Sequence, residues 1–184
     1  MLQKIENGRA NLLSRGKKAL LQKGYGGVVI AELTAQCGMA TGTFYNYFRS
    51  KDALIDQIVS DDWAALLKKI RRRMERSDDA RANLEFLYAH LADFQRRYTF
   101  FAAGSAVRRG PVIHSEQENL QALYDIMADK FRRAGAAGAL VFGMSPENAA
   151  YMIVQTCMVA GRNPAMDFGD LWAFLHMTGR TPAE

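Results

Sequence analysis

Long hydrophobic runs are missing from this chain of 184 residues. The longest apolar stretch, residues 149–160, is interrupted by Gln155 and Thr156 and falls short of the roughly 18 apolar residues that a membrane-spanning helix needs. The first residues also lack the apolar centre of a signal peptide. We therefore expect a cytoplasmic protein with no membrane association.

Clustered cysteines and catalytic motifs are equally scarce. Cys37 and Cys157 lie in unrelated apolar surroundings without metal-ligand spacing, so we interpret them as reduced core residues. The three histidines, His90, His114 and His176, are scattered, and no serine stands in a recognisable motif with histidine and aspartate. No phosphate-binding loop is present either. The sequence therefore predicts no enzyme, no cofactor and no metal site.

Strand-forming segments are nearly absent, and helical periodicity fills the chain instead. Gly24 follows the first helical stretch as a C-terminal cap, whereas Ser50, Ser145 and Asp167 stand where N-terminal caps belong. These patterns predict an all-α fold of about nine helices, with residues 135–143 as a loop. The expected helices cover about residues 3–23, 29–37, 41–48, 51–76, 79–98, 100–108, 115–134, 146–161 and 168–178.

Positive charge is concentrated at one end. Residues 1–51 contain eight Lys or Arg and two acidic residues, a net charge of +6, whereas the remainder has a net charge of −1. A basic head on a nearly neutral body is typical of a polyanion-binding module joined to a part that does not meet the polyanion.

The basic head also contains a helix-turn-helix pattern in residues 38–48. With Gly38 as the turn, an α-helical spacing of about 100° per residue places Phe44 and Phe48 on one face. Gly42, Thr43 and Asn46 fall on the opposite face, with Tyr45 and Tyr47 on the flanks. A small polar ridge between two phenol hydroxyls suits a DNA major groove bounded by two phosphate strands.

Residues 12–54 resemble the DNA-binding domain of the TetR family of transcriptional regulators. The resemblance implies a helix-turn-helix DNA-binding domain at residues 1–50 and a helical effector-binding and dimerisation domain at residues 51–184. The chain departs from the family's usual pattern at three places. Gly16 stands where the family usually has alanine, Val28-Val29 where it often has a capping Ser or Thr, and Ala40 where it commonly has serine. The matching residues are Leu12, Leu13, Leu20, Gly24, Tyr25, Leu33, Gly38, Gly42, Thr43, Phe44, Tyr45, Tyr47, Phe48, Ser50 and Lys51.

Geometry and resemblance together indicate the DNA contacts. The phosphate candidates are Thr43, Tyr45, Tyr47 and Lys51, and the base-edge candidates are Thr41, Gly42 and Asn46. Alternatively, the two tyrosines are half-buried aromatics that pack the small domain, and Asn46 is a solvated polar residue.

A single helix-turn-helix reads few base pairs, so we expect a homodimer on a double-stranded DNA operator. The last two helices are apolar over more than one face and would pair with their symmetry mates. The alternative is that they pack wholly within one chain. The interface candidates are Tyr151, Val154, Met158, Leu171, Trp172 and Leu175.

The resemblance also implies a small-molecule effector pocket among the middle helices. The candidates are rich in aromatic rings and sulfur, which favours an apolar or aromatic ligand; ordinary core packing is the alternative for each. The basic run at residues 68–73 is interpreted as a solvated face. The pocket candidates are Trp63, Phe86, His90, Phe94, Phe101, Tyr124, Met127, Phe131 and Met152.

The sequence therefore predicts a ligand-responsive DNA-binding regulator, a repressor released when its effector shifts the helix that begins at Lys51. The alternative is a helical sensor or enzyme whose basic N-terminal domain binds a protein or RNA partner. The sequence identifies neither the effector nor the operator.

Overall fold

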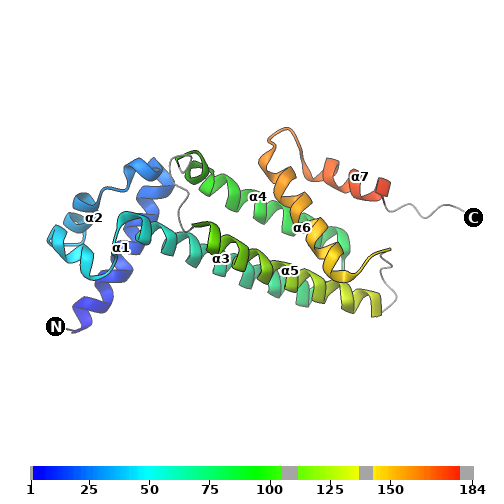
Figure 1. Cartoon of the computed structure of the whole chain (residues 1–184), viewed down its shortest axis with the longest axis horizontal. Helices are drawn as coiled ribbons and strands as arrows, with labels where there is room; N and C mark the ends of the chain where they lie inside the picture. Colours follow the sequence, from blue (N-terminus) through cyan, green and yellow to red (C-terminus); the bar gives the residue numbers. More distant parts are fainter. Residues whose placement is uncertain (1, 105–111, 137–142, 179–184) are drawn as a thin grey trace, which may run out of the picture. The chain divides into compact units, whose positions relative to one another are not determined.

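The structure is a computed structural model that describes residues 2–104, 112–136 and 143–178. Over these residues the chain forms seven α-helices and two 3-10 helices without a strand, so the predicted all-α fold is confirmed (Figure 1). No helix in the described ranges is long and apolar enough to cross a membrane. The elements are α1 (Leu2–Lys23), η1 (Tyr25–Gly27), α2 (Ile30–Gln36), η2 (Thr41–Asn46), α3 (Lys51–Arg76), α4 (Ala80–Gly104), α5 (Val112–Ala136), α6 (Pro146–Arg162) and α7 (Phe168–Thr178).

The chain divides into two compact units. The first unit contains the residues up to Trp63 and those from Arg97 to Ile113. The second unit contains residues 64–96 and the residues from His114 onward. Both α3 and α4 therefore contribute to both units. The assignment of residues 1–50 to DNA binding and of residues 51–184 to effector binding stays a prediction.

The core of the first unit lies between α1, α2, η2 and the first turns of α3. Large apolar side chains from all four elements are fully or almost fully buried there, namely Leu12, Leu20, Leu33, Phe44, Phe48, Leu54, Ile55 and Ile58. Gly16 of α1 faces α3 closely, since a Cβ atom at this position would lie 3.0 Å from Leu54 Cδ2. The glycine costs helix propensity, by roughly 1 kcal/mol, but it lets the two helices approach.

Local side-chain chemistry sets the helix ends, as the sequence predicts. Gly24 ends α1 with a φ of 69°, a left-handed conformation that glycine adopts without strain. The Ser50 hydroxyl accepts a hydrogen bond from the Ala53 amide at 3.1 Å, which caps α3. Ser145 caps α6 in the same way, with Pro146 in the first turn, and Asp167 accepts from the Asp170 amide at the start of α7.

The predicted break before Phe100 is wrong. The helix α4 continues without interruption to Gly104, and the remaining residues of the expected short helix lie outside the described ranges. Thr99 is only a mediocre helix former, and no glycine or proline interrupts the chain before Gly104. Similarly, α5 includes Gly135 and Ala136, which we expected in a loop.

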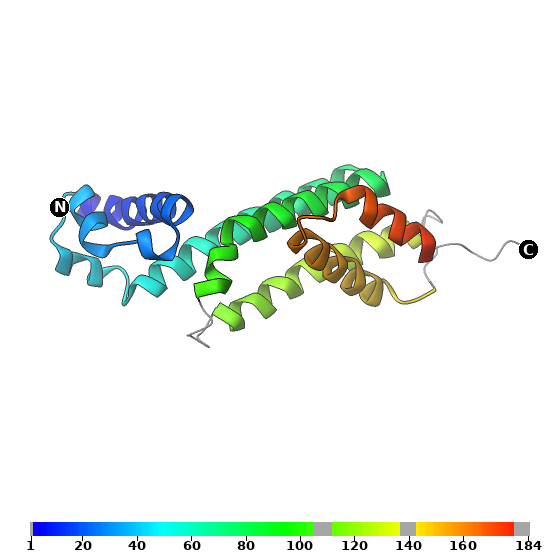
Figure 2. The ribbon, with the colours of Figure 1, turned by 90° about the horizontal axis from the view of Figure 1, so that it is seen from above.

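In the second unit α6 packs against both α4 and α5 (Figures 1 and 2). The Gln95 side chain of α4 donates to the Met158 carbonyl of α6 at 3.1 Å, and Gln155 of α6 donates to the Tyr124 hydroxyl of α5 at 2.6 Å. Cys157 is buried in this unit, and burial raises its pKa to about 12, so its thiol stays neutral at physiological pH. Cys37, expected in the core, is only half-buried.

Candidate nucleic-acid interface

The segment predicted as a recognition helix is the short 3-10 helix η2. Its first backbone hydrogen bond runs from the Thr43 amide to the Ala40 carbonyl at 2.9 Å, and no side chain caps it. Phe44 and Phe48 are buried, with ring centroids 5.8 Å apart, so both serve as the apolar anchor that the sequence predicts. The α-helix predicted over residues 41–48 is therefore wrong, since a 3-10 helix has three residues per turn instead of 3.6 and is wound more tightly.

Above this anchor, polar and aromatic groups face solvent. Tyr45 is 58% exposed, and Thr41, Gly42 and Asn46 are exposed as well. An added Cβ atom at Gly42 would meet no atom within 4 Å, so another backbone can approach there. Gly38 makes the preceding turn with a φ of 66°. The exposed residues form what we call the η2 ridge (Thr41, Gly42, Tyr45 and Asn46).

Tyr47 is placed differently from Tyr45. It is half-buried, and a Cβ atom at Gly8 of α1 would lie only 2.6 Å from the Tyr47 hydroxyl and 3.1 Å from the Met39 Cε atom. The absence of a side chain at Gly8 therefore makes room for the Tyr47 ring. This packing agrees with the half-buried alternative, and it places the hydroxyl beside the N-terminal half of α1.

Lys51 begins α3 next to an aromatic ring. Its Nζ atom lies 4.0 Å from the centroid of Tyr25, whose hydroxyl donates to Asp52 Oδ1 at 2.6 Å. Desolvation lowers the pKa of Lys51 from its ordinary value, and the neighbouring Asp52 opposes this shift. Tyr25 therefore links Lys51 and Asp52, so the ammonium group is held in place at the helix start.

The two valines at the start of α2 provide no N-terminal cap, but one of them packs into the core. Val29 occupies the N-cap position without a side-chain hydrogen bond, whereas Val28 is almost fully buried. Burying a valine side chain stabilises a fold by roughly 1.5–3 kcal/mol, more than the roughly 1 kcal/mol that a cap contributes. The departure at Val28-Val29 therefore exchanges a cap for core packing.

A polar cluster that the sequence did not reveal joins α1, α3 and α4 within the first unit. The Asp62 carboxylate accepts from Lys17 Nζ and from the Tyr98 hydroxyl, each at 2.5 Å, and Arg97 Nη1 lies 3.6 Å away. Desolvation, reinforced by the bond to Asp62, raises the pKa of Tyr98. These residues are far apart in sequence, so no local pattern could have identified the Asp62 cluster (Lys17, Asp62, Arg97 and Tyr98).

The predicted effector-pocket residues lie in different surroundings within the described part of the chain. Trp63, Met127 and Phe131 are buried, whereas Met152 is 55% exposed. Phe86 stacks on His90, with ring centroids 4.0 Å apart, and lines a surface hollow together with basic residues of α3. Phe94 is half-buried, and the Tyr124 hydroxyl accepts a hydrogen bond from Gln155. The side chain of Phe101 lies outside the described residues.

The predicted dimer residues divide between the inside and the outside of the chain. Val154 and Leu171 are fully buried within one chain, so they cannot touch a partner directly. Met158, Trp172 and Leu175 are half-buried. The exposed apolar side chains on α6 are Tyr151, Met152 and Val159, with exposed fractions of 52%, 55% and 65%. We call these three the outer face of α6.

The turn at Gly38 between α2 and η2, with its buried aromatic anchor, defines a helix-turn-helix protein. Residues 12–58 match the sequence model of the bacterial regulatory proteins of the tetR family. This segment of the chain therefore matches the TetR family, as the resemblance predicted.

Two curated relatives are similar over the same part of the chain. The transcriptional repressor DhaR of Mycobacterium sp. (strain GP1) and the transcriptional repressor NemR of Escherichia coli (strain K12) are each 31% identical over 67 residues. The aligned stretch covers 36% of this chain and 34% of each relative, so the chain matches about a third of their length.

Solved structures extend the likeness of the fold to nearly the whole chain. Escherichia coli NemR in its reduced form aligns with a TM-score of 0.70 at 19% identity, over 96% of this chain and 100% of that one. A TetR/AcrR-family regulator from Thermobifida fusca aligns with a TM-score of 0.72 at 15% identity, over 94% and 98% of the two chains. The second unit therefore shares the fold of these regulators.

Proposed function

We propose that this protein is a DNA-binding transcriptional regulator that acts as a repressor. The observation that carries the proposal is the exposed η2 ridge on its buried aromatic anchor, inside the segment that matches the tetR family. The relatives that match this segment are described as transcriptional repressors. No cluster of three or more metal-ligating side chains occurs among the residues that the structure describes.

In this proposal the η2 ridge enters the major groove. The Tyr45 hydroxyl and the Lys51 ammonium group would hold phosphates on its two sides, with Thr43 in support, whereas Thr41, Gly42 and Asn46 would face base edges. Tyr47 would contact a phosphate from beside α1, where Gly8 leaves room for its ring. The backbone amides at the start of α3 would offer a further phosphate contact near Lys51.

The outer face of α6 supports a homodimer. On this helix Ala150, Val154 and Cys157 are buried against the rest of the chain, whereas Tyr151, Met152 and Val159 lie on the exposed side. Pairing two copies through these exposed side chains would remove them from water and present two η2 ridges to successive half-sites.

A small apolar or aromatic effector in the second unit would release the operator. The aromatic and sulfur-containing side chains on α4, α5 and α6 provide the interior for such a ligand. Because α3 belongs to both units, a ligand that prefers one arrangement of the second unit can act on the DNA-binding unit through this helix.

The test measures binding of the full chain to the DNA upstream of its own gene by fluorescence anisotropy, over a range of salt concentrations. We expect Tyr45→Phe and Lys51→Gln each to weaken binding by about tenfold, which corresponds to the loss of roughly one hydrogen bond or charge contact. Several phosphate contacts also predict a steep fall of affinity with salt.

The matched control is Lys18→Gln, which removes the same charge from an exposed position on α1. It should lower the affinity clearly less than Lys51→Gln. If Tyr45→Phe, Tyr47→Phe and Lys51→Gln combined left DNA binding unchanged, the assignment of these contacts would be wrong. Binding to RNA or to a protein, but to no DNA, would favour the alternative function.

A further inference from the structure

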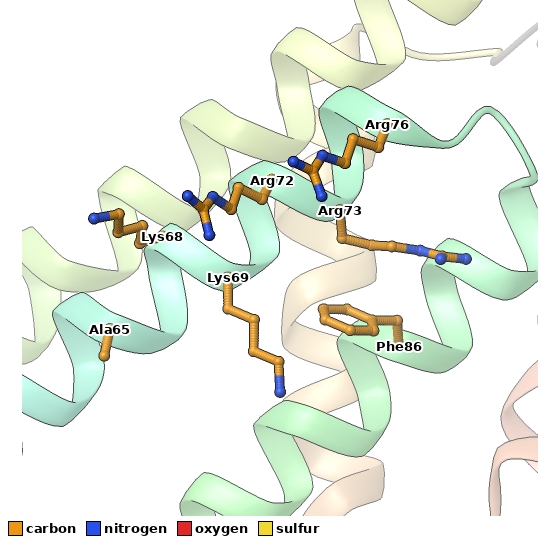
Figure 3. A pocket seen from close by; sticks show the side chains of 7 residues that line it. All are labelled: Ala65, Lys68, Lys69, Arg72, Arg73, Arg76 and Phe86. Carbon is orange, nitrogen blue, oxygen red and sulfur yellow. The ribbon is translucent and has the colours of Figure 1, made fainter.

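Basic side chains from the C-terminal half of α3 line a surface hollow together with Phe86 of α4, within the second unit, and of these Lys69 and Arg73 lie nearest the ring (Figure 3). The hollow is open to solvent and has a volume of about 400 Å³. The sequence suggested only a solvated basic face here. We call this feature the basic hollow, and its side chains are Lys68, Lys69, Arg72, Arg73, Arg76 and Phe86.

The inner wall of the basic hollow is held in place by several contacts. Lys69 Nζ and Arg73 Cζ each lie 5.7 Å from the centroid of Phe86. Arg73 Nε donates to Asn83 Oδ1 at 3.0 Å, and Asn83, which is itself buried, donates to the Ser77 carbonyl at 2.7 Å. The ring of Phe86 and the guanidinium group of Arg73 therefore have fixed positions before any ligand arrives.

The positive charge of the basic hollow is not neutralised within the described part of the chain. None of its five cationic side chains lies within 4.0 Å of a described carboxylate, whereas Lys130, Arg132 and Arg133 on α5 all pair with acids. Like charges gathered at helical spacing repel one another, and an anion between them relieves this repulsion.

The helix dipole does not account for the whole cluster. Cations stabilise a helix C-terminus, but the effect falls off within the last turn. Arg73 and Arg76 lie in that turn of α3, whereas Lys68 and Lys69 precede it by one turn or more. Their alignment with Arg72 and Arg76 on one face at spacings of three and four residues therefore needs another explanation.

We propose that the basic hollow binds a small polyanion of the nucleoside polyphosphate class. Its phosphates would lie between Lys69, Arg72 and Arg76, and its planar ring would pack beside Phe86. Guanidinium groups suit phosphates because their paired N–H groups match two phosphate oxygens. The inference does not rest on the proposed function, since the hollow lies wholly in residues 65–86, outside the segment that matches the tetR family.

Size and composition favour a small molecule over a nucleic-acid backbone. A volume of about 400 Å³ falls in the usual range for small-ligand sites. A DNA backbone needs a track of cations but no aromatic ring, because a ring contributes nothing to holding its phosphates. The hollow instead combines a cluster of cations with one ring.

The test uses isothermal titration calorimetry on the full chain with ATP, inorganic triphosphate and adenosine, at low and at raised salt. We expect ATP to bind more tightly than triphosphate, adenosine not to bind measurably, and raised salt to weaken both phosphate ligands. The double variant Arg72→Gln/Arg76→Gln should lower the ATP affinity at least tenfold. Phe86→Leu should lower the affinity for ATP but not for triphosphate.

The matched control is Arg71→Gln/Lys18→Gln, which removes two positive charges from exposed positions outside the hollow. It should retain ATP binding, and thermal melting should show that all variants are folded. Equal losses in the two double variants would overturn the proposal, as would a chain that binds neither ATP nor triphosphate at low salt. Loss of duplex DNA binding alone in Arg72→Gln/Arg76→Gln would also overturn it, because the phosphates would then be those of DNA.

Discussion

Gly8 has a role that only the folded chain shows. It lies inside α1, where alanine would ordinarily be the better helix former by roughly 1 kcal/mol. Here the missing Cβ atom makes room for the Tyr47 ring, whose hydroxyl would otherwise be 2.6 Å from it. The residue thus ties the position of a candidate phosphate contact to a helix some forty positions earlier in the chain.

We expect Gly8→Ala to destabilise the protein by about 1–2 kcal/mol, because overpacking outweighs the gain in helix propensity. In a Tyr47→Ala background the same substitution should become neutral or stabilising, since the obstacle is gone. The free energy of unfolding of the two single variants and the double variant, measured in urea, gives the coupling between the positions.

Gly26→Ala provides the control, because an added Cβ atom there meets nothing within 4 Å. It should change the free energy of unfolding by less than about 0.5 kcal/mol. Additive effects of Gly8→Ala and Tyr47→Ala would contradict the packing described for Tyr47.

At the scale of single residues, the sequence identified the buried anchors better than the exposed contacts. Phe44 and Phe48 follow from helical spacing alone, because both are apolar and lie four positions apart. Tyr47 is half-buried because Gly8 leaves room for its ring, and the Lys51 ammonium group is positioned by the Tyr25 ring. In both pairs the two residues are far apart in the sequence. Periodicity predicts which side of an element is apolar, but it does not predict which distant residue covers it.

At the scale of helices, the Asp62 cluster connects three elements of the first unit. One carboxylate of α3 receives hydrogen bonds from Lys17 of α1 and from Tyr98 of α4. The Lys17 and Arg97 side chains are about 40% exposed, so solvent screens their attraction to Asp62. The bond to the buried Tyr98 hydroxyl is the part of the cluster that water screens least.

We expect Asp62→Asn to lower the free energy of unfolding by about 1–2 kcal/mol, in the range for a hydrogen bond to a charged group reduced by screening. Urea denaturation measures the change. Asp61→Asn is the matched control: Asp61 is exposed and accepts from Gln57 on its own helix, so its loss should cost less than about 0.5 kcal/mol. Equal stability of the two variants would show that the cluster does not stabilise the fold.

Helix boundaries were predictable where a local residue sets them. Ser50, Ser145 and Gly24 act on the amides or carbonyls of neighbouring residues, so their effect can be read from a few letters of sequence. The continuation of α4 past Thr99 was not predictable in this way, because no strong local residue decides it. The 3-10 winding of η2 likewise has no local signature at this length.

At the scale of the whole molecule, the proposed homodimer depends on the outer face of α6. Tyr151, Met152 and Val159 expose a band of apolar surface on a helix whose opposite side is buried. The sequence predicted that α6 is apolar on several sides. It did not distinguish the inward Val154 from the outward Val159, because both are valines on one helix.

We expect Val159→Glu to weaken dimerisation by at least tenfold, about 1.4 kcal/mol, because a carboxylate would have to lose water within an apolar contact. Sedimentation velocity over a range of protein concentrations measures the shift toward monomer. Gln121→Glu, which places the same charge on an exposed position of α5, should leave the association unchanged. A wild-type chain that sediments as a monomer at all concentrations would contradict the dimer.

The division of the first unit along the chain has a consequence for the newly synthesised protein. Its two parts are separated by residues 64–96, and the Asp62 carboxylate meets the Tyr98 hydroxyl only after all of these have been translated. At roughly 5–20 residues per second the ribosome needs a few seconds for that stretch. During this interval η2 is already complete, while the unit that holds it still lacks the contribution of α4.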